Sequence, residues 1–91
     1  MENNLRILDF MSTWCQPCRT MSPILEEVEK ETGVTIQKIN VDEDEEHVIA
    51  YGVRNIPTLI FLKDNKVVDK VSGTVSKEVL INKINEYSRR T

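Results

Sequence analysis

Cys15 and Cys18 are the only cysteines of the chain, and Gln16 and Pro17 separate them. Side chains three positions apart lie on one face of a helical turn, close enough for two thiols to form a disulfide. The pair follows an apolar run at 5–11 and opens an amphipathic segment, so it falls where a strand passes into a helix. We therefore predict a dithiol–disulfide redox site, which exchanges two electrons with its substrate.

The two cysteines are predicted to have different roles. Thiol–disulfide exchange needs an exposed thiolate that attacks and a second thiol that resolves the mixed disulfide. Cys15 begins the helix, where unpaired N–H groups and the helix dipole stabilise a thiolate, so we predict that it is the exposed nucleophile. Cys18 lies one turn further along and is predicted to be the more buried, resolving thiol. Gln16 and Pro17 restrain the loop and are predicted to tune its redox poise.

Two other uses of the cysteine pair stay open from the residues alone. A zinc site usually takes four ligands, and Cys15, Cys18 and His47 are the only soft ligands of this chain. A structural disulfide is the other possibility, but closing so short a loop would restrain the unfolded chain only slightly. Both interpretations explain the spacing less well than a redox site does.

Size and composition place the chain among ordinary globular proteins. It has 91 residues, 40% hydrophobic and 30% charged, and we predict a single domain over residues 1–91. A net charge of −3 without a basic cluster argues against a nucleic-acid partner, and no apolar run approaches the length that spans a membrane. Residues 1–4 lack the features of a signal peptide. We therefore expect a cytoplasmic monomer, in a compartment where structural disulfides are rare.

The hydrophobic pattern predicts an α/β protein with the element order β-α-β-α-β-β-α. The predicted strands cover 5–11, 34–41, 56–62 and 66–72, and the predicted helices cover 15–32, 42–51 and 76–87. Pro23 falls inside the first helix and is predicted to kink it. The acidic run at 42–46 is predicted to be the solvated start of the second helix, with a cation or basic-partner site as the alternative. Together these elements predict a central four-stranded mixed sheet flanked by helices.

Several motifs of this chain resemble those of the thioredoxin family. They are the strand ending in Asp9-Phe10, the segment Trp14-Cys15-Gln16-Pro17-Cys18, Pro23, the strand at 38–42 and the loop at 51–58. The resemblance runs from about Leu5 to the last helix and implies a thioredoxin-like fold. The chain starts almost directly on the central strand, so we expect a four-stranded core. It departs from the family where Gln16 replaces the usual Gly and where Met11-Ser12-Thr13 replaces an aromatic-Ala segment.

Asp9 and Lys38 gain roles from this resemblance. A lone carboxylate in an apolar strand is costly to bury in its charged form, which favours a functional explanation for Asp9. The resemblance implies that Asp9 lies beneath the disulfide, has a raised pKa and relays a proton to or from Cys18. It also implies that Lys38 lies near Asp9 and tunes the charge of its carboxylate.

The same resemblance implies a substrate-docking surface around the exposed sulfur. Pro57 would follow a cis peptide bond and would place the backbone of Ile56 beside Cys15, where it can bond an extended substrate chain. Trp14, Ile56 and the turn at Gly73-Thr74 would supply the apolar surface.

The resemblance implies a protein-disulfide reductase that serves electron transport and cell redox homeostasis. Its substrates would be protein disulfides, and a thioredoxin-reductase-type donor would regenerate it. The redox-active element would be the Cys15–Cys18 disulfide itself, with no bound cofactor and no metal. Three alternatives stay open: a glutaredoxin-like reductase that uses glutathione, a thioredoxin-fold accessory or binding subunit, and a disulfide-forming oxidase.

Overall fold

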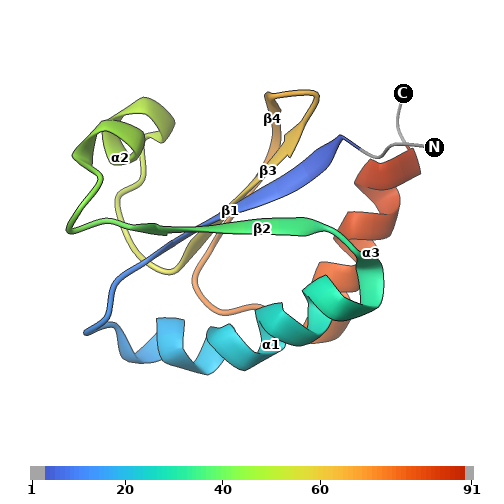
Figure 1. Ribbon diagram of the computed structural model, residues 1–91, viewed down its shortest axis with the longest axis horizontal. Coiled ribbons are helices and arrows are strands. Elements are labelled where there is room, and N and C mark those ends of the chain that lie inside the picture. Colours follow the sequence, from blue (N-terminus) through green and yellow to red (C-terminus); the bar gives the residue numbers. More distant parts are fainter. Residues whose placement is uncertain (1–3, 90–91) are drawn as a thin grey trace.

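The computed structural model describes residues 4–89, which form three helices packed on one four-stranded sheet (Figure 1). The strands are β1 (Leu5–Met11), β2 (Thr35–Asn40), β3 (Thr58–Lys63) and β4 (Lys66–Ser72), and the helices are α1 (Gln16–Thr32), α2 (Glu45–Tyr51) and α3 (Lys77–Arg89). The predicted α/β class and element order are confirmed.

The sheet is mixed and has the strand order β2-β1-β3-β4. β1 pairs with β2 in parallel and with β3 in antiparallel fashion, and β4 pairs antiparallel with β3. β1 is therefore hydrogen-bonded on both sides. In this register Asp9 lies between Lys38 of β2 and Leu59 of β3, so a carboxylate occupies the middle of the sheet.

Helices cover both faces of the sheet, with α1 and α3 on one face and α2 on the other (Figure 1). Successive residues of a strand point to opposite faces, so β1 contributes Ile7 to one core cluster and Leu8 to the other. The larger cluster includes Leu25 of α1 and Leu80 of α3. The smaller one packs against Val48 of α2. β1 is thus buried on both faces and gives the loop that follows it, which leads to Cys15, a fixed starting point.

Where the ends of the elements differ from the predicted boundaries, they do so by one to three residues. β3 begins at Thr58 rather than Ile56, because the Ile56–Pro57 peptide bond is cis and Pro57 has no N–H for a strand ladder. The second helix begins at Glu45, because the side chain of Asp44 accepts a hydrogen bond from the His47 N–H at 3.0 Å and caps it there.

Helix α1 begins at Gln16, with Cys15 as its N-cap, and continues through Pro23. It ends at Gly33, which adopts φ +75° and donates its N–H to the Glu29 carbonyl at 2.9 Å. At its other end, the first turn of α1 directly follows the short loop after β1, the central strand. The two cysteines therefore lie at the end of β1.

Candidate redox site

Cys15 and Cys18 are joined in a disulfide with their Cα atoms 5.2 Å apart. The backbone N–H of Cys15 donates to the Ser12 carbonyl at 3.5 Å, which turns the chain from β1 toward α1. The Cys15 Sγ accepts the backbone N–H of Cys18 at 3.2 Å, so a sulfur atom caps the helix where Ser or Asp usually does. The predicted disulfide at the helix start is present.

The predicted difference in burial between the two cysteines is wrong for this disulfide form. Cys15 is 4% exposed and Cys18 is 7% exposed, so neither is open to solvent and Cys18 is not the more buried. The Cys15 sulfur is folded back over the first turn of α1, where it is bonded to Cys18 and accepts its N–H. Between the two cysteines, Gln16 and Pro17 are exposed, and they belong to that first turn.

Asp9 lies in the middle of β1 and is 4% exposed. Its burial raises the pKa of the carboxyl group from 3.8 to about 6, and the positive charge of Lys38 opposes part of that rise. The carboxyl group therefore titrates near neutral pH. A carboxyl group with such a pKa can both accept and return a proton under physiological conditions.

One small cavity brings Asp9 and Cys18 together. Its volume is about 210 Å³, and its walls are formed by Asp9, Met11, Ser12, Thr13, Cys18, Arg19, Ser22 and Lys38. A space of this size with polar walls is large enough for water molecules. The carboxyl group, the second sulfur and the Lys38 side chain thus share one compartment at the end of β1.

A second concavity borders Trp14, which is 66% exposed. Its volume is about 390 Å³, and it is lined by Trp14, Val41, Glu45, Val48, Val53, Arg54, Asn55 and Ile56. The Trp14 Nε1–H donates to Asp42 Oδ2 at 2.7 Å, which fixes the indole against the end of β2. Sequence analysis missed this contact, because it assigned Asp42 to a solvated acidic run.

The loop before β3 faces the turn after β4. The Pro57 carbonyl accepts the N–H of Gly73 at 2.8 Å, and Gly73 adopts φ +87°, a conformation that a side chain would strain. This bond holds the Gly73-Thr74 turn beside the cis-proline loop. Thr74 is exposed next to it.

Arg19 makes two contacts with the loop that the sequence did not indicate. Its guanidinium donates twice to the Thr13 carbonyl, from Nη2 at 2.7 Å and from Nε at 3.2 Å. Because Thr13 precedes Trp14 in the loop, these two bonds fix the loop against the first turn of α1. Their signal in the sequence is weak, since Arg19 is one of many charged residues on exposed helix positions.

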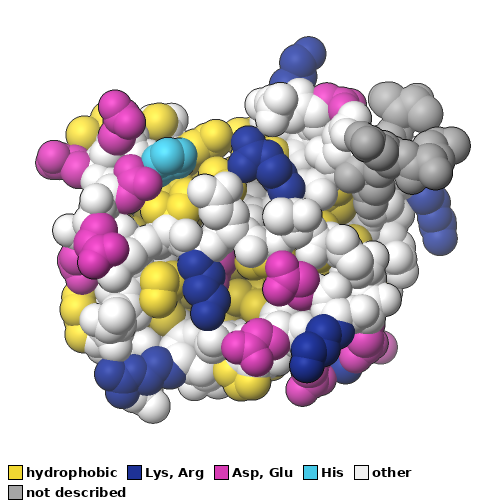
Figure 2. Space-filling view, in the orientation of Figure 1, with side chains coloured by type: hydrophobic (Ala, Val, Ile, Leu, Met, Phe, Trp, Pro, Cys, Tyr) yellow, Lys and Arg dark blue, Asp and Glu magenta, His cyan; other side chains and the backbone are white. Residues whose placement is uncertain are grey.

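In the part of the chain that the structure describes, His47 and the two cysteines do not form a zinc site. His47 Nδ1 lies 2.8 Å from Asp44 Oδ2, and its ring stacks on Tyr51 with the centroids 6.2 Å apart. Figure 2 shows acidic side chains gathered around this histidine at the end of the molecule where α2 lies. Within residues 4–89, no three His, Cys, Asp or Glu side chains are grouped so that they could hold a metal ion.

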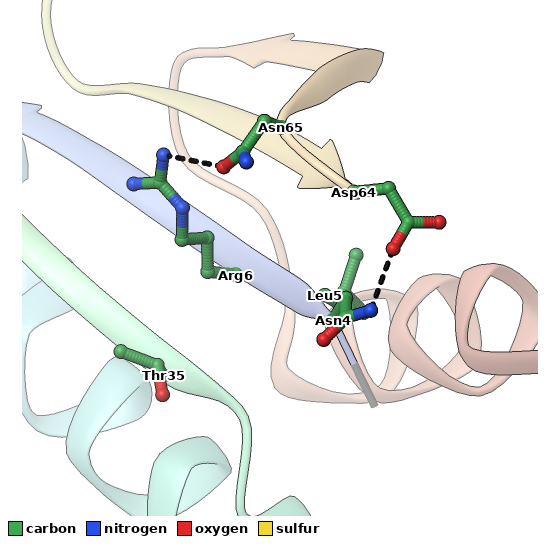
Figure 3. A pocket seen from close by; sticks show the side chains of 6 residues that line it. All are labelled: Asn4, Leu5, Arg6, Thr35, Asp64 and Asn65. Atoms are coloured by element: carbon green, nitrogen blue, oxygen red, sulfur yellow. Dashed lines mark hydrogen bonds between the residues drawn. The ribbon is translucent and has the colours of Figure 1, made fainter. Parts of the chain in front are cut away.

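The cavity shown in Figure 3 lies at the far end of the sheet, where β1 begins, and has a volume of about 430 Å³. Arg6 donates to Asn65 Oδ1 at 3.3 Å and Asn4 donates to Asp64 Oδ1 at 2.6 Å, so two bonds tie the start of β1 to the β3–β4 turn. This cavity contains no cysteine and is separate from the redox site. In the described part of the chain, no helix has both the length and the apolar character needed to cross a membrane.

A disulfide that caps a helix, above a carboxyl group buried in the central strand, defines a thiol–disulfide oxidoreductase. The Thioredoxin family model matches residues 1–86, and the chain belongs to the thioredoxin family. It is 45% identical over 85 residues to a thioredoxin of Chlamydia caviae, covering 92% of this chain and 83% of that protein. A thioredoxin of Listeria monocytogenes is also 45% identical over 85 residues, with coverages of 91% and 82%.

Solved structures show the same relationship. A mutant thioredoxin from Halobacterium salinarum superposes with a TM-score of 0.92 at 34% identity, covering 98% of this chain and 79% of that one. A thioredoxin from Fasciola hepatica superposes with a TM-score of 0.86 at 37% identity, with coverages of 94% and 83%. The predicted thioredoxin-like fold and the thiol–disulfide oxidoreductase activity are confirmed.

Proposed function

We propose that the chain reduces protein disulfides, with Cys15 as the nucleophile, Cys18 as the resolving thiol and Asp9 as the proton acceptor. The observation that carries this proposal is the cavity of about 210 Å³ that Asp9 shares with Cys18 but not with Cys15. Only one of the two sulfurs borders the same space as the buried carboxyl group. The position of Cys15 at the start of α1 suits a thiolate, because the helix N-terminus stabilises its negative charge.

The proposed exchange takes two steps. The Cys15 thiolate attacks one sulfur of the substrate disulfide, whose S–S bond breaks, and the departing substrate thiolate takes up a proton. Cys18 then gives its proton to the Asp9 carboxylate and attacks the Cys15 sulfur. The Cys15–Cys18 bond forms, and the second substrate thiolate leaves and is protonated. The substrate gains two electrons and two protons, and the protein ends as the disulfide seen in the structure.

The proposed docking surface consists of Trp14, Ile56, Pro57, Gly73 and Thr74. Trp14 and Ile56 line the same concavity, and the bond from Gly73 to the Pro57 carbonyl holds the remaining turn beside them. An extended substrate segment would bond the backbone of Ile56 and lay apolar side chains against Trp14. Gln16 and Pro17 would set the poise of the disulfide, and Lys38 would tune the charge of Asp9.

The wider assignment follows from this chemistry. The proposed substrates are disulfides of other proteins, and a thioredoxin-reductase-type donor returns the disulfide to the dithiol without a cofactor bound to this chain. We place the protein in the cytoplasm as a single-domain monomer that takes part in electron transport and redox homeostasis. A reducing compartment is where a dithiol donor of this kind finds its electron supply.

The equilibrium reduction potential of the Cys15–Cys18 pair tests the direction of the reaction. Titration against a dithiol buffer, followed by thiol alkylation, should give a value near or below about −250 mV, in the range of a reductase. A value above about −180 mV would make a disulfide-forming oxidase the better assignment. Efficient recycling of the oxidised protein by glutathione alone would favour the glutaredoxin-like alternative.

The roles of the two sulfurs are tested by trapping. Cys18→Ser should accumulate a mixed disulfide between Cys15 and a protein substrate, because the resolving thiol is missing. Cys15→Ser is the matched control and should accumulate none. Equal trapping by both variants would contradict the assigned order of attack.

A further inference from the structure

Ser12 carries a buried hydroxyl group without a partner. The residue follows β1 directly and is 1% exposed, and within residues 4–89 its Oγ has no hydrogen-bond partner. Buried hydroxyl groups are nearly always hydrogen-bonded, because burial removes the bonds they would make with water. Ser12 also stands in the segment where this chain departs from the usual aromatic-Ala pattern of the family. An unpaired hydroxyl group here therefore calls for a functional explanation.

The position of Ser12 ties it to the redox pair. Its carbonyl accepts the Cys15 N–H at 3.5 Å, and the residue forms part of the wall of the cavity that also contains Asp9 and Cys18. Among the side chains that line that cavity, the acceptors that can carry a negative charge are the Asp9 carboxyl group and the Cys18 sulfur, since a lysine ammonium such as that of Lys38 only donates.

Asp9 becomes neutral when it takes the proton of Cys18, so only the Cys18 sulfur becomes a stronger acceptor during the proposed reaction. The Asp9 carboxyl group is already in the cavity in the disulfide form, and the Ser12 hydroxyl group does not bond it there. The Cys18 sulfur is tied to Cys15 in this form and is a weak acceptor. When the disulfide opens, Cys18 becomes a thiol or a thiolate, and a thiolate is a strong, charged acceptor.

We propose that Ser12 is a positioning residue whose hydroxyl group donates a hydrogen bond to the Cys18 sulfur once the disulfide is open. The hydroxyl group turns about a single bond to do so. The bond stabilises the Cys18 thiolate before it attacks Cys15. This role rests on the proposed function of Cys18 as the resolving thiol, and it adds a hydrogen-bond donor to the cavity that also contains the proton acceptor Asp9.

Three charged groups border the same cavity, and a test must leave them unchanged. They are Asp9 on β1, Lys38 on β2 and Arg19 on α1, whose guanidinium is held by the Thr13 carbonyl. Ser12→Ala removes one hydroxyl group and alters none of these charges. Ser22→Ala is the matched control, because Ser22 belongs to the same cavity wall but is part-exposed.

The first measurement is the pKa of Cys18 in a Cys15→Ser background, followed by thiolate absorbance as the pH is raised. Ser12→Ala should lower the acid dissociation constant of Cys18 about three- to tenfold, the usual effect of one hydrogen bond. Ser22→Ala should leave it unchanged, and Ser12→Thr, which keeps the hydroxyl group, should stay within about twofold of the parent.

The second measurement is the reduction potential with both cysteines in place. Because the bond stabilises the Cys18 thiolate and cannot form in the disulfide, Ser12→Ala should shift the equilibrium toward the disulfide by the same factor at a pH above the pKa of Cys18. A tenfold shift corresponds to a potential about 30 mV lower. A hydroxyl group that is merely structural would change the stability of both forms equally and leave the potential unmoved.

Two results would overturn the proposal. One is an unchanged Cys18 pKa in Ser12→Ala, whatever happens to stability. The other is a shift in the titration of Asp9 alone, which would assign the hydroxyl group to the carboxyl group. Neither result would mean that the proposed function has failed. The reduction potential of the parent protein tests the proposed function, whereas the shift caused by Ser12→Ala tests the role of Ser12.

Discussion

Two aspartates on different strands of the same sheet have pKa values shifted in opposite directions. Asp9 on β1 is buried with only the charge of Lys38 to oppose the rise of its pKa to about 6. Asp69 on β4 accepts hydrogen bonds from Lys83 Nζ at 2.8 Å and from the Tyr87 hydroxyl at 2.7 Å, both on α3. Burial alone would raise the pKa of Asp69, but these donors outweigh it and hold the pKa below its ordinary value.

The comparison separates a carboxylate that holds the fold together from one that is kept reactive. Asp69 ties β4 to α3 and gains from being charged, because donors on the neighbouring helix replace the water it loses. Asp9 is destabilised when charged and therefore takes up a proton readily. The charged form of Asp9 therefore lowers the stability at the redox end, whereas the charged form of Asp69 raises it at the β4–α3 junction.

The largest effect is expected when Asp9 becomes neutral. The folded protein holds a proton on Asp9 up to pH of about 6, whereas the unfolded chain releases it near 3.8, so this group lowers the stability as the pH rises between those values. Asp9→Asn should therefore raise the free energy of unfolding of the oxidised protein at pH 8 by about 2–3 kcal/mol. Urea unfolding at pH 8 and pH 4 measures this. A gain of equal size at both pH values would contradict the explanation.

Asp69→Ala should have the opposite sign. Removing the acceptor leaves the Lys83 and Tyr87 donors without it, so the free energy of unfolding at pH 7 should fall by about 1–3 kcal/mol. Because the pKa of Asp69 is lowered in the folded state, its stabilisation is present at neutral pH and is lost as the pH falls below that of an ordinary aspartate. Urea unfolding at pH 7 and pH 3 should show the difference shrink in acid. The reduction potential should stay the same, and a shift would couple this junction to the redox end.

Tyr87→Phe sharpens the comparison by removing one donor and keeping the ring. The ring of Tyr87 packs against Phe61 with the centroids 5.7 Å apart, and a phenylalanine preserves that contact. The loss should be about 0.5–1.5 kcal/mol, the net value of one hydrogen bond. Urea unfolding at pH 7 measures it, and a loss as large as that of Asp69→Ala would mean that Lys83 contributes nothing.

The smallest effect is expected at the exposed ion pairs between α3 and α1. Lys77 Nζ lies 3.0 Å from Glu27 Oε1 and also contacts Glu31, but solvent and salt screen such pairs. Lys77→Gln should leave the urea midpoint unchanged within error at physiological ionic strength. A clear fall in the midpoint would show that surface charge, and not only the buried junction, holds α3 in place.

Local patterns were sufficient for the element order and for the disulfide. The spacing of Cys15 and Cys18 requires no knowledge of the rest of the chain, and short apolar runs or alternating apolar residues indicate the strands. The cis bond before Pro57 could be expected only from the family resemblance, because proline in a sequence permits either isomer. The burial of Cys15 was missed, since it depends on how the loop folds back over the helix that it caps.

The remaining features depend on contacts between distant parts of the chain. Asp69 is 14 residues from Lys83 and 18 from Tyr87, and each of them, taken alone, looks like an ordinary strand or helix residue. Ser12 was visible in the sequence only as a departure from a family pattern. Its missing partner became apparent once β1, the loop and α1 enclosed a common cavity.

The order of strands in the sheet also bears on when the chain becomes reactive during folding. The β3–β4 hairpin closes over a two-residue turn, whereas β1 must find β3 about fifty positions away and β2 through the whole of α1. Two cysteines so close in sequence can meet in an unfolded chain, but Asp9 gains its surroundings only after these long-range pairings form. We expect the thiols of a newly made chain to behave as ordinary peptide thiols until the central strand is in place. The rate at which the two thiols react with an alkylating agent would then show when β1 pairs with β2 and β3 during folding.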